Sequence, residues 1–179
     1  MLCLFKIIIM KKTIFILSVI FSVTFTESLI AQGTIVDVAI GNKDFSTLVT
    51  ALKSADLVSA LQGKGPFTVF APTNDAFAKI DSETLNSLLE EKNKKALSNI
   101  LTYHVISGKL AASDVVAALK KGNGSVELTA LNGQVITVVQ KDGKIWLQDS
   151  KGNYSEISAT DVMGSNGVIH VIDTVVMPE

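Results

Sequence analysis

The chain has 179 residues, a mass of 19.1 kDa and a formal net charge of −1 from 16 basic and 17 acidic side chains. Its length is that of about one domain, and its hydrophobic content of 47% excludes a disordered chain. All of its basic side chains are lysine. Nucleic-acid-binding proteins usually combine a basic surplus with arginine, so we exclude nucleic acid as a partner.

The N-terminal segment, residues 1–31, is predicted to be a secretory signal peptide. Lys11 and Lys12 form its positive region, an apolar run follows over residues 13–25, and Ala31 is the expected last residue removed. An uncleaved membrane anchor is the alternative, but the apolar run is shorter than the roughly 20 residues that span a bilayer. We expect no stable membrane span after cleavage, and a protein that is secreted, periplasmic or held at the cell surface.

The rest of the chain, residues 32–179, is expected to fold as one domain without disulfides, because the only cysteine, Cys3, leaves with the signal peptide. Helical patterns come first, with apolar residues recurring at spacings of three and four, as in Phe45, Leu48 and Leu52. The segments with this pattern are 45–55, 57–61, 73–77, 82–91, 94–103 and 112–121.

Strand patterns interrupt the helices and then replace them. The run between Pro66 and Pro72 is β-branched and aromatic, which predicts a short buried strand. Further along, apolar and polar residues alternate, and Asn132-Gly133 predicts a type I′ hairpin turn. The segments with strand character are 125–130, 135–140, 145–147, 154–159 and 168–176. Helices followed by antiparallel strands predict an α+β domain.

Recognisable catalytic motifs are missing from the sequence. His104 and His170 each lie in an apolar run, which predicts imidazoles that are hydrogen-bonded inside the fold. No G-x-S-x-G or H-E-x-x-H pattern occurs, and residues 63–65 lack the spacing of a phosphate loop and are interpreted as a turn. A pair of glycosidase carboxylates stays open, because the sequence does not give their separation. We expect no catalytic residue, no metal and no cofactor.

Three segments resemble the signatures of the fasciclin (FAS1) domain family. GPFTVFAPTNDAF at residues 65–77 is similar to the first signature, LTYHV at 101–105 to the Tyr-His motif, and DVMGSNGVIHVID at 161–173 to the second signature. The resemblance extends over residues 34–178. It implies a wedge-shaped β-sandwich of two sheets, with helices packed on one side and edge, in a secreted or cell-surface protein.

The same resemblance implies a function and four binding residues. The family is not known for enzymes, and it implies cell adhesion or the binding of extracellular matrix, surface proteins or polysaccharides. In animal members, the Tyr-His segment and an Asp-Ile pair are implicated in integrin binding. The matching residues here are Tyr103, His104, Asp161 and Val162, the last replacing isoleucine. Each also has a structural interpretation, respectively as a packed ring, an internal hydrogen-bonding group, a turn residue and a core residue.

Two functions therefore stay open. The favoured one is a non-enzymatic protein, of unknown oligomeric state, that binds an extracellular or envelope protein or polysaccharide. Its short signal with a lysine pair suggests a bacterial member, whose ligand need not be an integrin. The alternative is a small-molecule or lipid carrier, or a cryptic hydrolase, that uses a groove between helices and sheet. An apolar cavity on the order of several hundred Å³ would favour a carrier, and a filled interior would argue against one.

Overall fold

The computed structural model describes residues 33–179. The predicted signal peptide at residues 1–31 lies outside the described residues and stays a prediction. Within the described part, no helix is long and apolar enough to cross a membrane. The helices, including the 3-10 turns η2 and η3, are α1 (Ile35–Gly41), η2 (Lys43–Phe45), α2 (Ser46–Ser54), α3 (Val58–Leu61), α4 (Asn74–Ala78), α5 (Ser82–Leu89), η3 (Glu91–Asn93), α6 (Lys94–Tyr103) and α7 (Ala112–Lys121). The strands are β1 (Phe67–Pro72), β2 (Val105–Ser107), β3 (Ser125–Thr129), β4 (Val135–Lys141), β5 (Lys144–Gln148), β6 (Tyr154–Gly164) and β7 (Gly167–Ile172).

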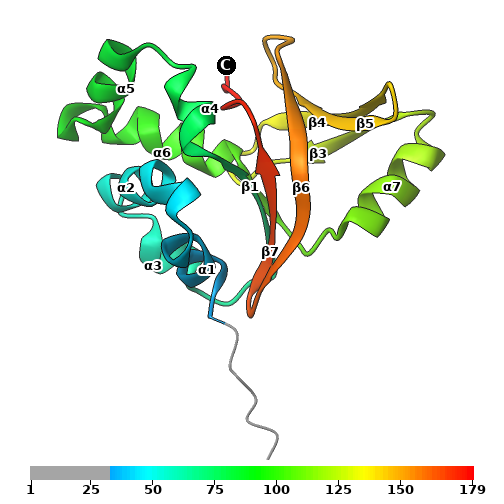
Figure 1. Ribbon diagram of the computed structural model, residues 1–179, viewed down its shortest axis with the longest axis horizontal. Helices are drawn as coiled ribbons and strands as arrows, with labels where there is room; N and C mark the ends of the chain where they lie inside the picture. The colour runs from blue at the N-terminus through cyan, green and yellow to red at the C-terminus, as the bar shows by residue number, and fades with distance from the viewer. Residues whose placement is uncertain (1–32) are drawn as a thin grey trace, which may run out of the picture. The chain divides into compact units, whose positions relative to one another are not determined.

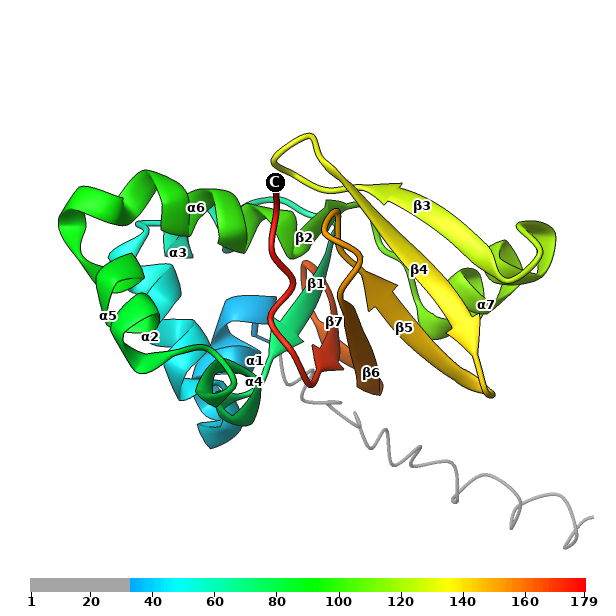
Figure 2. The ribbon, with the colours of Figure 1, turned by 90° about the horizontal axis from the view of Figure 1, so that it is seen from above.

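One seven-stranded sheet has the order β2-β1-β7-β6-β5-β4-β3. Residues 67–72 of β1 pair in parallel with residues 167–172 of β7, and the other neighbours are antiparallel. The long strand β6 pairs with β5 at its start and with β7 afterwards, and its register shifts within residues 157–162. Such irregularities bend a strand. The bend at β6 divides the sheet into two arms, β2-β1-β7 and β5-β4-β3, and Figure 2 shows these arms turned toward each other. The ends of the sheet nearly close, because the Leu131 N–H donates to the Val105 carbonyl at 2.7 Å.

Helices α1 to α6 cover one face of the central strands β1 and β7 (Figure 1). Their apolar stripes form one buried cluster with the sheet, in which Phe45, Leu52 and Leu101 from the helices meet Val69 and Ile169 from the strands. Burial of these stripes is the main stabilising contribution to helices as short as these.

A second buried cluster fills the space between the two arms of the sheet. Phe70 of β1 and Tyr103 at the end of α6 contribute to it on one side and Leu147 of β5 on the other, while Val115 and Leu119 of α7 close its edge. β1 and β7 are therefore covered on both faces, as expected of a parallel pair. The expected α+β class and wedge-shaped sandwich are confirmed, with one difference: the two expected sheets are a single sheet that folds at β6.

Several element boundaries differ from the sequence prediction. Helix α1 was not expected; it begins after Thr34, whose side chain and that of Asp37 satisfy each other's backbone N–H groups. Strand β6 continues to Gly164 instead of ending at residue 159, because it carries the bulges that bend the sheet. Strand β7 ends at Ile172 instead of 176, because the N–H groups of Thr174 and Val176 donate to the side chains of Ser155 and His104.

The predicted type I′ turn at Asn132-Gly133 is also different. A type I′ turn requires positive φ at both residues, and only Gly133 has it, with φ of 86°. The Asn132 side chain instead accepts from the Gln134 N–H at 3.1 Å. Both conditions are met in the next hairpin, where Asp142 has φ of 54° and Gly143 has φ of 76°.

Candidate functional site

Tyr103 and His104, two of the four residues implied by the family resemblance, lie inside the protein. The Tyr103 ring is completely buried, its hydroxyl donates to the Val135 carbonyl at 2.9 Å, and burial raises the pKa of Tyr103. The bond joins the end of α6 to the start of β4. Tyr103 is therefore well placed to hold the two arms of the sheet together.

His104 is 2% exposed and has a partner for each ring nitrogen. Its Nδ1 donates to the Ile100 carbonyl at 2.8 Å, and its Nε2 accepts from the Val176 N–H at 3.3 Å. These partners require the neutral imidazole. Burial, partly offset by the bond to Ile100, lowers the pKa of His104 to about 4. The expectation of an internal hydrogen-bonding histidine is confirmed.

Asp161 and Val162, the other two implied residues, lie on β6 and are partly exposed. Asp161 has φ of 60°, and its Oδ1 accepts from the Ala112 N–H at 2.9 Å, where α7 begins. Val162 is paired with Ile169 of β7 and packs against the helix-side cluster. These contacts differ from those of the Tyr-His pair, so the four residues do not form one hydrogen-bonded site.

His170 is the second structural histidine. Its Nε2 donates to the Leu110 carbonyl at 2.8 Å, and its Nδ1 accepts from the Asp161 N–H at 3.4 Å. The centroid of its ring lies 5.7 Å from the centroid of the Phe70 ring. As in His104, both ring nitrogens are occupied by backbone groups, so neither histidine is placed to deprotonate a serine. Within residues 33–179, no three metal-binding side chains gather as a possible metal site.

The interior between helices and sheet is filled. In the described residues, the apolar cavity between α1, α2 and the central strands measures about 20 Å³. Another, beside His104 and α5, measures about 10 Å³. Each has room for about one water molecule and is far smaller than a small-molecule site. This packing argues against the carrier alternative.

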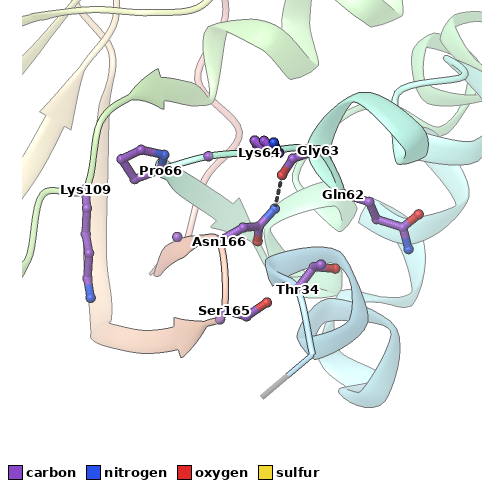
Figure 3. Close-up of a pocket in the computed structure, with 11 residues that line it drawn as sticks. Thr34, Gln62, Gly63, Lys64, Pro66, Lys109, Ser165 and Asn166 are labelled. Atoms are coloured by element: carbon purple, nitrogen blue, oxygen red, sulfur yellow. Dashed lines mark hydrogen bonds between the residues drawn. The ribbon is translucent and has the colours of Figure 1, made fainter. Parts of the chain in front are cut away.

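A polar groove lies at one end of the central strands, with a volume of about 620 Å³ (Figure 3). It is formed where four segments meet: the start of α1, the turn between α3 and β1, the β6–β7 hairpin, and the loop between β2 and α7, which brings Lys109. Its lining residues are Thr34, Gln62, Gly63, Lys64, Gly65, Pro66, Lys109, Gly164, Ser165, Asn166 and Gly167. Sequence reasoning interpreted residues 63–65 only as a turn and assigned no site to the hairpin.

Asn166 joins the first three of these segments through its side chain. Its Nδ2 donates to the Leu61 carbonyl at 2.8 Å and to the Gly63 carbonyl at 2.9 Å, and its Oδ1 accepts from the Ile35 N–H at 2.9 Å. Figure 3 shows the bond to Gly63 across the middle of the groove. The amide thus uses both of its donors and its acceptor to hold the floor of the groove in one arrangement.

The backbone segments at the groove are in close contact. A Cβ placed on Gly65 would lie 2.0 Å from the Asn166 carbonyl oxygen, and one on Gly167 would lie 2.2 Å from the Phe67 carbonyl oxygen. Because only glycine fits such an approach, the Gly-Lys-Gly-Pro turn and the hairpin share one closely packed base. Glycines in both signature segments were the available signal for this site, but they do not reveal which turns meet.

Comparison with known proteins assigns the family. The sequence model of the fasciclin domain family matches residues 43–178, and the chain belongs to the fasciclin family. It is 51% identical over 145 residues to protein sll1483 of Synechocystis sp., covering 81% of this chain and 73% of that one. It is 38% identical over 147 residues to the transforming growth factor-beta-induced protein ig-h3 of Sus scrofa, covering 82% of this chain and 20% of that protein.

A solved structure supports the fold. The FAS1 domain pair of the insect cell adhesion molecule fasciclin I matches with a TM-score of 0.70 at 21% sequence identity. The match covers 80% of this chain and 50% of that one. The chain therefore spans about half of that domain pair and a fifth of the ig-h3 relative.

Proposed function

We propose that the protein is an exported binding protein that acts by adhesion to an extracellular or envelope protein or polysaccharide, without a covalent step. The observation that carries this proposal is the use of both histidines as structural groups, each with two backbone partners. Family membership supports it, since fasciclin I is a cell adhesion molecule. The filled interior favours a surface over an internal ligand site.

The four residues implied by the resemblance take different parts in this proposal. Asp161 and Val162 are partly exposed and are proposed as residues that a partner contacts. Tyr103 and His104 are buried and are proposed to act indirectly, by fixing the strands that carry the binding surface.

The first test is location and binding of the exported protein. Cell fractionation with N-terminal sequencing of the mature chain tests export, and we expect Gln32 as the first residue. The immobilised protein is then offered extracellular polysaccharide, envelope proteins and matrix proteins beside an unrelated secreted protein of similar charge. Retention of one of these above that control supports the proposal. Retention of none above the control, or a chain that stays in the cytoplasm, contradicts it.

A matched pair of variants tests Asp161 itself. Asp161→Asn keeps an acceptor for the Ala112 N–H and a residue type that tolerates positive φ, but removes the charge. Asp142→Asn makes the same change at an exposed turn residue with φ of 54°. We expect weaker binding only for the first variant. Equal binding by the two variants would remove Asp161 from the contact surface.

A further inference from the structure

The charges that line the polar groove all have the same sign. Lys64 and Lys109 are its charged residues within the described part of the chain, and both are exposed. Neither ammonium group has a salt bridge within residues 33–179. Since the whole chain has a net charge of −1, this local positive charge does not follow from the overall composition.

Asp37 is an acidic neighbour of the groove residues. Its Oδ2 accepts from the N–H and the hydroxyl of Thr34, each at 2.8 Å, and its Oδ1 accepts from the Gln62 amide at 3.3 Å. The bonds from the Thr34 hydroxyl and backbone hold the pKa of Asp37 below its usual value. Asp37 is not among the residues that line the groove, and its carboxylate is already bonded on both oxygens. These bonds leave its negative charge in place, but within residues 33–179 Asp37 forms no salt bridge with Lys64 or Lys109, so both lysines are available to an anion.

The uncharged lining offers donors and acceptors of the kind that sugars use. Ser165 brings a hydroxyl group and the glycine-rich turns bring backbone groups, whereas the Thr34 hydroxyl is already bonded to Asp37. Among the described residues, no aromatic side chain lines the groove, so they offer no surface on which a nucleobase could stack. The volume of about 620 Å³ is in the range of small-ligand sites. The groove is also open to solvent, which suits one stretch of a longer chain.

The groove is formed before a ligand arrives. The Asn166 side chain bridges segments more than 100 residues apart in the sequence, with three bonds of 2.8 to 2.9 Å. Binding to such a base loses little conformational entropy beyond that of the lysine side chains.

We infer that this groove binds an acidic polysaccharide, with Lys64 and Lys109 contacting its carboxylate or sulfate groups. The hydroxyl and backbone groups between them contact the sugar hydroxyls. Lysine acts as a point charge without a fixed bidentate geometry, so the two anions share one chemistry at this site. The inference rests on the proposed function and names the class of its ligand.

The test is a binding titration with defined probes. The full chain is expressed and the exported protein is titrated with polygalacturonate oligomers, sulfated dextran and neutral dextran. The groove variant is Lys64→Gln with Lys109→Gln. The matched control is Lys120→Gln with Lys121→Gln, which removes the same charge from two exposed residues in the last turn of α7. A further variant, Ser165→Glu, places a carboxylate in the groove at an exposed position.

We expect an acidic probe to bind the native protein, and the groove variant to bind it roughly tenfold more weakly, as two exposed ion pairs would give. The α7 control should bind within about twofold of the native protein, Ser165→Glu should lose binding, and added salt should weaken it. Selective binding of either acidic probe supports the inference and identifies the anion. No binding of either, equal binding of neutral dextran, or equal loss in the α7 control overturns it.

The variants should keep the native thermal midpoint, because the altered side chains are exposed. The outcome also separates the two proposals. If the native protein and the groove variant are retained equally on envelope or matrix material, the ligand assignment is disproved and the adhesion function still stands.

Discussion

Replacing His104 with glutamine should make the stability of the protein less sensitive to mild acid. In the unfolded chain the imidazole binds a proton near its ordinary pKa of 6.5, whereas in the folded protein the pKa is lowered to about 4. Between these two values the unfolded state holds the extra proton, so the free energy of unfolding falls as the pH falls. One proton corresponds to about 1.4 kcal/mol per pH unit. The whole window from pH 6.5 to 4 therefore costs about 3 kcal/mol.

Two aspartates with lowered pKa values lose their contribution at lower pH. The Thr34 hydroxyl and backbone lower the pKa of Asp37. At Asp173, burial by itself raises the pKa, but hydrogen bonds from Lys79, the Glu156 N–H and Thr174 together lower it by more, so the pKa is lowered overall. Both carboxyls start from an ordinary pKa of 3.8, so the stability they add is lost below that pH. The interval above pH 4 therefore reports mainly on groups other than these two.

The assay is chemical denaturation at several pH values from 7 to 4, with the native protein and His104→Gln side by side. Glutamine can keep an acceptor for the Val176 N–H but does not titrate. We expect the variant to be less stable at pH 7 by about 1–3 kcal/mol, because it loses part of the native hydrogen bonding and packing. Its stability should then fall less steeply, by about 1.4 kcal/mol per pH unit. Parallel stability curves for the two proteins would refute the argument.

Three further substitutions test the packing of the core and of the groove by chemical denaturation. Phe70→Ala should cost about 3–5 kcal/mol, because this side chain is completely buried between the arms of the sheet; an unchanged midpoint would contradict its placement. Asn166→Ala should cost about 2–4 kcal/mol through its three lost bonds, whereas Ser165→Ala should change stability by less than about 0.5 kcal/mol. Gly65→Ala should cost at least about 2 kcal/mol, because its Cβ would lie 2.0 Å from a carbonyl oxygen; Gly41→Ala, with open space around it, serves as the control, and equal effects would show that the close approach is not rigid.

The regular parts of the fold were predictable because their patterns are local. Leu48 and Leu52 repeat at helical spacing and do lie on the buried face of α2. The apolar neighbours of His104 correctly indicated a buried, hydrogen-bonded ring. Helix α1 escaped prediction because its sequence, IVDVAIG, is rich in β-branched residues with low helix propensity. The Thr34 capping box and the burial of Ile35 and Val36 outweigh that propensity.

The site was predictable only in part. The resemblance placed Asp161 in a signature segment, but its positive φ and its bond to the Ala112 N–H at the start of α7 become visible only in the folded structure. The polar groove was missed because its segments are far apart in the chain. Asn166 contacts the backbone of Leu61 across 105 positions, and no local pattern in the sequence encodes such an encounter.

The parallel pairing of β1 with β7 has a consequence for biosynthesis. Residues 167–172 form the last strand of the sheet in chain order, yet this strand lies inside the sheet and pairs on both sides with strands made earlier. In a nascent polypeptide that has not yet reached this strand, the apolar helices have no complete surface on which to dock. Cooperative folding of this domain then waits until residues 167–172 have been made and can pair with β1 and β6.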